Sequence, residues 1–263
     1  MDSNSSLKDR LEDIYAQFNK RCYVDPDPLM FLYEYPQAED REIVALIASA
    51  LAYGRVAQIL KSVRKILDVL GPHPRRFLLA TPKFEVDEAL EGFKHRFSSG
   101  AEMSLLLAGA RRAIETYGSM ENCFISNFTS KHDSILPALE KFSQFLCSEF
   151  PNGESYLLPS PEKGSACKRV NLMLRWLVRS DDVDPGGWAQ LPASKLLVPL
   201  DTHMFRIARS LGLTKRNSPD LKSAAEITRG FARISPEDPV KYDFSLTRSG
   251  INPEVRKSGA IGL

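Results

Sequence analysis

The chain has 263 residues, enough to bury a full core as one large domain or as two lobes that share a cleft. Its composition, 43% hydrophobic and 26% charged with a net charge of +2, is that of an ordinary globular protein. No apolar run approaches the roughly 20 residues that cross a bilayer, so we expect no membrane partner.

The cysteines are scattered and form no CxxC pair, which argues against a zinc ribbon, an iron–sulfur cluster and a disulfide framework. We therefore expect no metal, no cofactor and a reduced compartment. The polar start, residues 1–6, is unlike a secretory signal, so the expected location is cytoplasmic. The four cysteines are Cys22, Cys123, Cys147 and Cys167.

Charge is unevenly distributed along the chain. Residues 1–159 carry 18 Lys and Arg against 22 Asp and Glu, whereas residues 160–263 carry 17 against 11. The first part therefore has a charge of −4 and the second of +6. A basic part beside an acidic one is compatible with a nucleic-acid-binding face.

Helical periodicity begins in the first quarter of the chain. Apolar residues spaced three and four apart predict one helix over 43–51 and another over 59–70. Gly54 is expected to separate them, and Gly71 with Pro72 to end the second.

Further helical patterns cover most of the remaining chain, at about 101–118, 134–150, 165–180, 201–212, 219–232 and 236–249. No alternating strand pattern and no Asn-Gly or Asp-Gly hairpin between apolar runs is present. Turn-forming residues concentrate in 151–161 and 180–188, and such loops often deliver side chains into clefts. The sequence predicts an all-α protein and assigns no role to residues 75–150.

Asp201 stands directly before a helix with an apolar face. Aspartate is a favoured N-cap, so capping is the plain interpretation of this residue. Gly212 follows as the expected stop. The apolar face consists of Met204, Ile207, Ala208 and Leu211.

Together with its neighbours, Asp201 also carries a resemblance. Thr202, His203, Arg206 and the pair Leu211-Gly212 match in register the V-D-T-H-x-x-R-x-x-x-R-L-G segment of helix–hairpin–helix (HhH-GPD) DNA glycosylases. The resemblance implies that Asp201 is the essential catalytic carboxylate.

Residues 164–174 are similar to the second half of the hairpin in that superfamily, G-V-G-R-K-T-A-N-V-V-L. Lys168 then falls on the lysine that bifunctional members use as nucleophile. Residues 158–163 lack the expected glycine spacing, and Lys163 is the alternative nucleophile. The plain interpretation of Lys168 is a solvated helix lysine or a phosphate contact.

The spacing of these segments along the chain indicates which branch of the superfamily the chain resembles most in layout. The 33 residues from Lys168 to Asp201 form a long gap, as in archaeal 8-oxoguanine glycosylases, with the 180–199 loop as the insertion. Residues 43–53 are similar to the F-E-L-L-I-A-V-L-L-S-A-Q helix, with Leu51 where some relatives have a gap-filling glutamine. The cysteine-cluster loop of endonuclease III is missing. The chain also resembles a bacterial family of uncharacterised function that is placed near this superfamily.

The resemblance implies a two-lobed helix–hairpin–helix glycosylase-like fold with a cleft between the lobes. Residues 37–194 would form a central lobe with the hairpin and Lys168. Residues 1–36 and 195–263 would form the second lobe, which carries Asp201.

The implied function is that of a DNA N-glycosylase/AP lyase that flips out and removes a damaged base such as 8-oxoguanine, in base-excision repair. A carboxylate stabilises positive charge that develops on the sugar, and an amine that attacks the same carbon gives a Schiff base. Expected DNA contacts are Gly164, Ser165, Arg169, Arg175, His203 and Arg206; candidates for the base pocket are Tyr53, Leu172, Trp176 and Trp188, with core packing as the alternative for Trp176.

Two other functions are compatible with the same residues. One is a non-catalytic DNA- or RNA-binding protein of this fold, and the other is an enzyme that acts on nucleosides or RNA. Metal-dependent hydrolysis is disfavoured because the four histidines form no ligand spacing. We expect a monomer that binds DNA, with RNA as the alternative partner.

Overall fold

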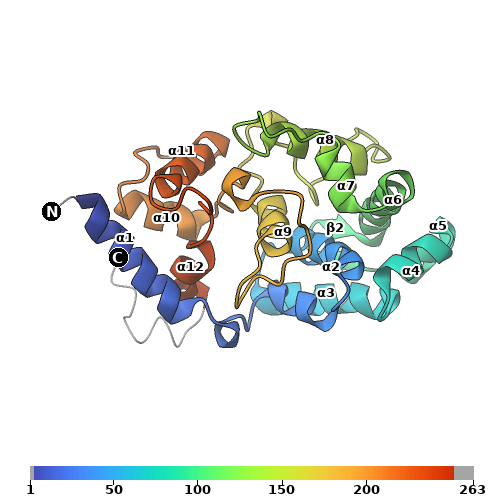
Figure 1. Cartoon of the computed structure of the whole chain (residues 1–263). Coiled ribbons are helices and arrows are strands. Elements are labelled where there is room, and N and C mark those ends of the chain that lie inside the picture. Colours follow the sequence, from blue (N-terminus) through green and yellow to red (C-terminus); the bar gives the residue numbers. More distant parts are fainter. Residues whose placement is uncertain (1–2, 252–263) are drawn as a thin grey trace.

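The computed structural model describes residues 3–251, and these are predominantly helical, as the sequence predicts (Figure 1). The first half contains α1 (Ser3–Phe18), η1 (Arg21–Tyr23), η2 (Pro28–Glu34), α2 (Ala38–Ala50), α3 (Val56–Leu70), α4 (Pro74–Ala80), α5 (Lys83–Ala89), α6 (Gly100–Tyr117) and α7 (Met120–Ile125). The second half contains α8 (Leu136–Leu146), η3 (Pro161–Lys163), α9 (Lys168–Val178), η4 (Ala193–Lys195), α10 (Thr202–Ser210), α11 (Leu221–Ala232) and α12 (Asp243–Ile251).

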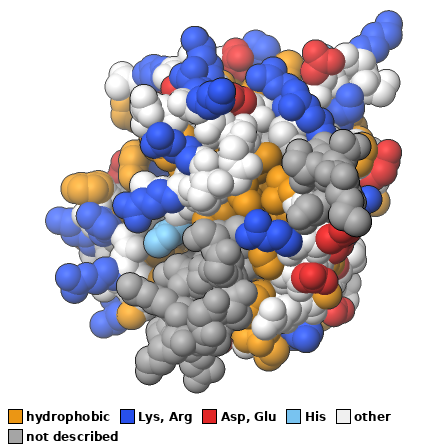
Figure 2. Space-filling model, turned by 90° about the vertical axis from the view of Figure 1, so that its left-hand side faces the viewer, with side chains coloured by type: hydrophobic (Ala, Val, Ile, Leu, Met, Phe, Trp, Pro, Cys, Tyr) orange, Lys and Arg blue, Asp and Glu red, His pale blue; other side chains and the backbone are white. Residues whose placement is uncertain are grey.

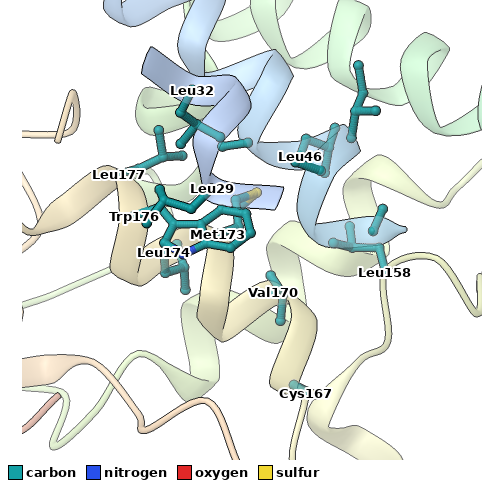
Figure 3. Packing of buried hydrophobic residues seen from close by; sticks show 14 of the residues in the cluster. Leu29, Leu32, Leu46, Leu158, Cys167, Val170, Met173, Leu174, Trp176 and Leu177 are labelled. Carbon is teal, nitrogen blue, oxygen red and sulfur yellow. The ribbon is translucent and has the colours of Figure 1, made fainter. Parts of the chain in front are cut away.

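Helices α2 and α9 form the centre of the larger group of helices. Every residue of α2 from Glu42 to Ala50 is buried, and α2 packs against both α9 and η2. Figure 3 shows Leu29 and Leu32 of η2, Leu46 of α2 and a row of α9 side chains meeting in this core. Packing on several sides holds α9, and with it Lys168, in a fixed position.

Several helix starts differ from the sequence prediction. Helix α2 begins at Ala38 rather than 43 and α3 at Val56 rather than 59, and the starts of α9 and α12 have a clear local cause. Helix α9 begins at Lys168 rather than near residue 165, because Cys167 has left-handed backbone geometry (φ +48°) that cannot continue a helix. Helix α12 begins at Asp243 rather than near 236. Pro239 disfavours helical geometry at the residue before it, and 236–242 form turns instead.

One small sheet was not expected. β1 (Lys94–His95) and β2 (Ser98–Ser99) pair antiparallel, with Lys94 opposite Ser99 and His95 opposite Ser98. Two residues in each strand are too few to show an alternating pattern, so this β-hairpin could not be predicted from periodicity.

The helices fall into two groups in Figure 1. Helix α1 packs on α12, and α12 packs on α10, so the N-terminal helix lies with the C-terminal ones. Helices α2 to α9 form the other group. Helix η2, which the predicted division placed with α1, contacts α2 and α3. The face that carries α1, α10 and α11 shows many Lys and Arg side chains (Figure 2).

Within residues 3–251, no helix is both long and apolar enough to span a membrane.

Candidate active site

Asp201 is fixed at the start of α10 by its own carboxylate. Oδ1 accepts the backbone N–H groups of His203 and Met204, both at 2.9 Å. The predicted N-cap is therefore confirmed. Because one oxygen satisfies both amides, Oδ2 is left to face outward from the cap.

Lys168 is fixed as the first residue of α9 by the turn before it. The Ser165 hydroxyl accepts the Cys167 N–H at 3.1 Å, and the Asn171 amide donates to the Ala166 carbonyl at 3.0 Å. The Gly164 carbonyl accepts the N–H of Leu221 at 3.0 Å, which ties this turn to the start of α11. These bonds hold the Lys168 backbone at the boundary between the two groups of helices.

The two residues meet. Lys168 Nζ lies 3.5 Å from Asp201 Oδ2, although 33 residues separate them in the chain. Their side chains are 33% and 26% exposed, so the pair is accessible without being fully solvated. Both residues line one pocket of about 950 Å³. An amine and a carboxylate thus converge on a space that a ligand can enter.

The pocket wall combines segments that are distant in the sequence. Tyr53 and Gly54 come from the loop between α2 and α3, Leu172 from α9, and His203 from α10. Gly164 and Ser165, two of the expected DNA contacts, also line it. Arg206 is exposed on α10 but is not among the described residues of the pocket wall.

Asp243 is a buried acid on the same wall. Its Oδ2 accepts a hydrogen bond from Arg175 Nη1 at 2.5 Å. Burial raises the pKa of Asp243 to about 6; Arg175 opposes this shift, the charge of Asp201 adds to it, and Lys168 opposes it. Asp243 therefore responds to the charges of the Lys168–Asp201 pair.

Two of the arginines expected to bind DNA, Arg169 and Arg175, line the pocket but have partners inside the protein. Arg169 is buried and donates to the carbonyls of Ala50 and Tyr156. Arg175 is buried and pairs with Asp184 and Asp243. Both guanidinium groups are therefore held by protein acceptors at the pocket wall, and their contact with DNA stays a prediction.

Two of the four candidates for the base pocket lie on the pocket wall, and the other two lie in the core. Tyr53 and Leu172 line the pocket, whereas Trp176 and Trp188 are core residues and cannot stack on a ligand in this structure. Figure 3 shows the Trp176 ring within the hydrophobic cluster. The indole N–H of Trp188 donates to buried Glu42 at 3.1 Å. For both tryptophans, ordinary packing is the correct interpretation.

Lys163 also lines the pocket, but it has a different partner. Its Nζ lies 2.5 Å from Glu154 Oε2 on the protein surface. Of the two candidate nucleophiles, only Lys168 contacts the Asp201 carboxylate among the ion pairs of the described residues.

Sequence reasoning named Asp201 and Tyr53 but missed Asp243, Asp27 and Tyr156 of the wall. Asp243 stands between Tyr242 and Phe244, and an acid between two large apolar side chains could have indicated a buried carboxylate. Asp27 pairs with Arg248 at 3.1 Å, and both line the pocket. Tyr156 lies in a turn-rich loop, where nothing in the local pattern indicated its place.

In the part of the chain that the structure describes, no group of three or more His, Cys, Asp and Glu side chains is arranged to hold a metal ion.

The fold and site thus define a predominantly helical protein with a lysine–aspartate pair in a pocket. Residues 27–252 match the family described as "Protein of unknown function (DUF2400)", and the chain belongs to that family. No curated protein and no solved structure matches the chain.

Proposed function

We propose that this protein is a DNA N-glycosylase with AP-lyase activity, in which Lys168 is the nucleophile and Asp201 the stabilising carboxylate. The observation that carries the proposal is the 3.5 Å approach of Lys168 Nζ to Asp201 Oδ2 on the wall of an open pocket. Placement of the two groups on opposite faces would have been incompatible with it.

The 3.5 Å distance between Lys168 Nζ and Asp201 Oδ2 allows both groups to act on the same carbon atom. An electrophilic carbon about 3–3.5 Å from an attacking amine is in a near-attack position. A carbon that sits beside Nζ can also lie close to Oδ2, because the two atoms are neighbours. The carboxylate then stabilises the positive charge that develops on the sugar as the base departs.

The chemistry balances with these two groups and water. The Lys168 ammonium first gives a proton to water. The neutral amine then forms a bond to C1′ of the sugar, and the C1′–N bond breaks with its electron pair leaving on the base, which takes up a proton. Loss of the amine proton and opening of the sugar ring give a Schiff base. Removal of a C2′ proton then expels the 3′-phosphate, and water releases the lysine.

The pocket has the size that the substrate requires. Small-molecule sites span about 300–1,000 Å³, and a volume of about 950 Å³ can receive an extruded nucleotide. Flipping the base out of a duplex costs a few kcal/mol, which contacts along the wall must offset. The N-terminus of α9 beside Gly164 and Ser165 is suited to the neighbouring phosphate.

The finer parts of the proposal rest on the sequence resemblance. They are a two-lobed glycosylase-like fold with its cleft at this pocket, a damaged purine such as 8-oxoguanine as substrate, DNA as partner, a monomeric state and a cytoplasmic location. The two groups of helices in Figure 1, with Lys168 on one and Asp201 on the other, support this arrangement.

Borohydride trapping tests the proposal. The protein is incubated with duplexes that contain an abasic site or 8-oxoguanine, and borohydride reduces any Schiff base to a stable adduct. We expect an adduct with the wild type, loss of it in Lys168→Ala, and wild-type levels in Lys163→Ala, because Lys163 does not contact Asp201.

Absence of an adduct from the wild type, or full trapping by Lys168→Ala, would reject the lyase mechanism. Salt-sensitive duplex binding without any cleavage would favour a non-catalytic binding protein of the same fold.

A further inference from the structure

Exposed aromatic rings adjoin the pocket. Phe97 at the tip of the β-hairpin is 75% exposed and Tyr156 is 55% exposed, yet their rings touch edge to face with centroids 6.5 Å apart. The Tyr156 ring also meets Tyr53, at 5.2 Å. Tyr53 and Tyr156 line the pocket that holds Lys168 and Asp201. Tyr53, Tyr156 and Phe97, here called the aromatic row, therefore lead from the pocket out to solvent.

The β-hairpin that carries Phe97 is anchored at its base. The imidazole of buried His95 bonds to the Ser62 hydroxyl at 2.8 Å and to the Tyr53 carbonyl at 3.1 Å. The Tyr53 hydroxyl lies 2.8 Å from both the His95 carbonyl and the Ser98 hydroxyl. A tip held by such a base is pre-organised, so a ligand that stacks on Phe97 loses little additional freedom in the protein.

Positive charge accompanies the aromatic row. The Arg169 guanidinium lies 4.3 Å from the centre of the Tyr156 ring and 4.9 Å from that of Tyr53, which fixes both rings. The Arg96 guanidinium lies 5.4 Å from the Phe97 ring. Arg55 and Lys94 are exposed nearby in the chain. Flat rings among cations suit a nucleic-acid strand, whose bases stack and whose phosphates are anionic.

We propose that the aromatic row is a stacking surface for an unpaired DNA base that flanks the nucleotide in the pocket. We take DNA as the ligand of this surface because of the proposed function, on which this inference rests. An apolar peptide would gain nothing from Arg96 and Lys94, whereas a displaced strand would use both rings and charges. The continuity of the row with the pocket places this base next to the reacting sugar.

The test compares affinities for DNA that cannot react. Fluorescence anisotropy measures binding to a duplex with a tetrahydrofuran abasic analogue and to the corresponding single strand. We expect Phe97→Ala and Tyr156→Ala each to weaken binding about tenfold or more, as loss of a base–aromatic stack does. Phe84→Ala is the matched control, because Phe84 is 62% exposed on α5 and lies outside the row; its affinity should equal that of the wild type.

A second variant reports stacking directly. Phe97→Trp retains a flat ring, so it should bind as the wild type does, and its added fluorescence should be quenched by the stacked base. Circular dichroism of each variant verifies the fold.

The outcomes separate this inference from the enzyme proposal. Wild-type affinity in Phe97→Ala and Tyr156→Ala, with normal borohydride trapping, would overturn the stacking surface alone. Weakened binding in these variants, with no trapping by the wild type, would reject the lyase and retain the surface. Failure of the wild type to bind either DNA would overturn both.

Discussion

The two carboxylate oxygens of Asp201 have different partners. Oδ1 caps α10, and Oδ2 faces Lys168 Nζ at 3.5 Å. This distance exceeds the 2.7–2.9 Å of a strong charge-assisted hydrogen bond, so the pair is an ion pair without such a bond. Asp201 therefore combines a structural role, the N-cap of α10, with the proposed chemical role. Substitutions of Asp201 can separate the two roles.

Asp201→Asn should keep the cap and lose the chemistry. Asparagine caps helices as well as aspartate does, so urea denaturation should show nearly wild-type stability. Asp201→Ala should lose about 1 kcal/mol of unfolding free energy because the amides of His203 and Met204 lose their acceptor. Neither variant should be trapped on DNA. Efficient trapping by Asp201→Asn would show that the negative charge is not needed.

Asp243 should make stability depend on pH. Burial raises its pKa to about 6, so folding favours the protonated acid. Its contribution to stability is complete below about pH 4, the ordinary range of an aspartate, and is lost as the pH rises through 6.

The measurement compares the wild type with Asp243→Asn by urea denaturation at a series of pH values. The unfolding free energy of the wild type, relative to the variant, should fall by roughly 2 kcal/mol between pH 4 and pH 7. A constant difference across this range would contradict the raised pKa.

The role of a single residue could be predicted from the sequence where its partners lie close to it in the chain. The Asp201 cap involves residues two and three positions away, so its pattern is visible in the sequence. The internal use of Arg175 was not visible, because its partner Asp243 lies 68 positions further along the chain.

Although α1, α4, α5 and α7 were missed, the other α-helices of residues 3–251 were predicted, because apolar residues at helical spacing record the surface that a helix buries. The β-hairpin was not, since its stability depends on contacts of His95 with Ser62 and Tyr53, which lie more than thirty positions away. The loop between α2 and α3 contacts the β-hairpin, and Gly54 in this loop leaves room for the Arg96 side chain.

Gly54→Ala should strain the loop between α2 and α3 and displace the Arg96 side chain. The φ of Gly54 is +100°, and an added Cβ would lie 2.8 Å from Arg96 Cδ and 2.9 Å from Arg96 Nη1. We expect a loss of about 1–3 kcal/mol from backbone strain, with a further loss as Arg96 moves.

Gly212→Ala serves as the control for Gly54→Ala. Its φ is +72° and no atom lies within 4 Å of the added Cβ, so it incurs backbone strain alone. Urea denaturation should therefore show the larger loss for Gly54→Ala. Equal losses would show that contact with Arg96 is unimportant.

At the scale of the whole molecule, buried ion pairs connect the two groups of helices. Arg175 of α9 pairs with Asp243 of α12 and with Asp184 in the loop after α9. Arg179 pairs with Asp184 and, at 2.8 Å, with Asp238. This network holds the helix that carries Lys168 against the group that carries Asp201.

Asp184→Asn should destabilise the protein strongly. Asp184 is fully buried, and its loss leaves the guanidinium groups of Arg175 and Arg179 under-compensated in the interior. Breaking a buried pair from one side costs about 3–5 kcal/mol. Glu34→Gln removes the exposed pair with Arg64 and should cost about 1 kcal/mol or less. Similar urea midpoints for the two variants would contradict a stabilising network.

The contact between Lys168 and Asp201 could not be derived from local patterns. It depends on how α9 and α10 are placed by packing, and the sequence pointed to it only through the resemblance of two separated segments to one superfamily. The division at residues 36/37 and 194/195 stays a prediction, with η2 contacting α2 and α3.

The central claim is that the Lys168 amine attacks a sugar carbon. Peptide mapping by mass spectrometry of the borohydride-reduced protein–DNA adduct tests it most directly. We predict that the mass of the reduced sugar fragment lies on the peptide that contains Lys168 and that fragmentation assigns it to that side chain. A modification on Lys163 or on any other amine, with Lys168 unmodified, would contradict the account.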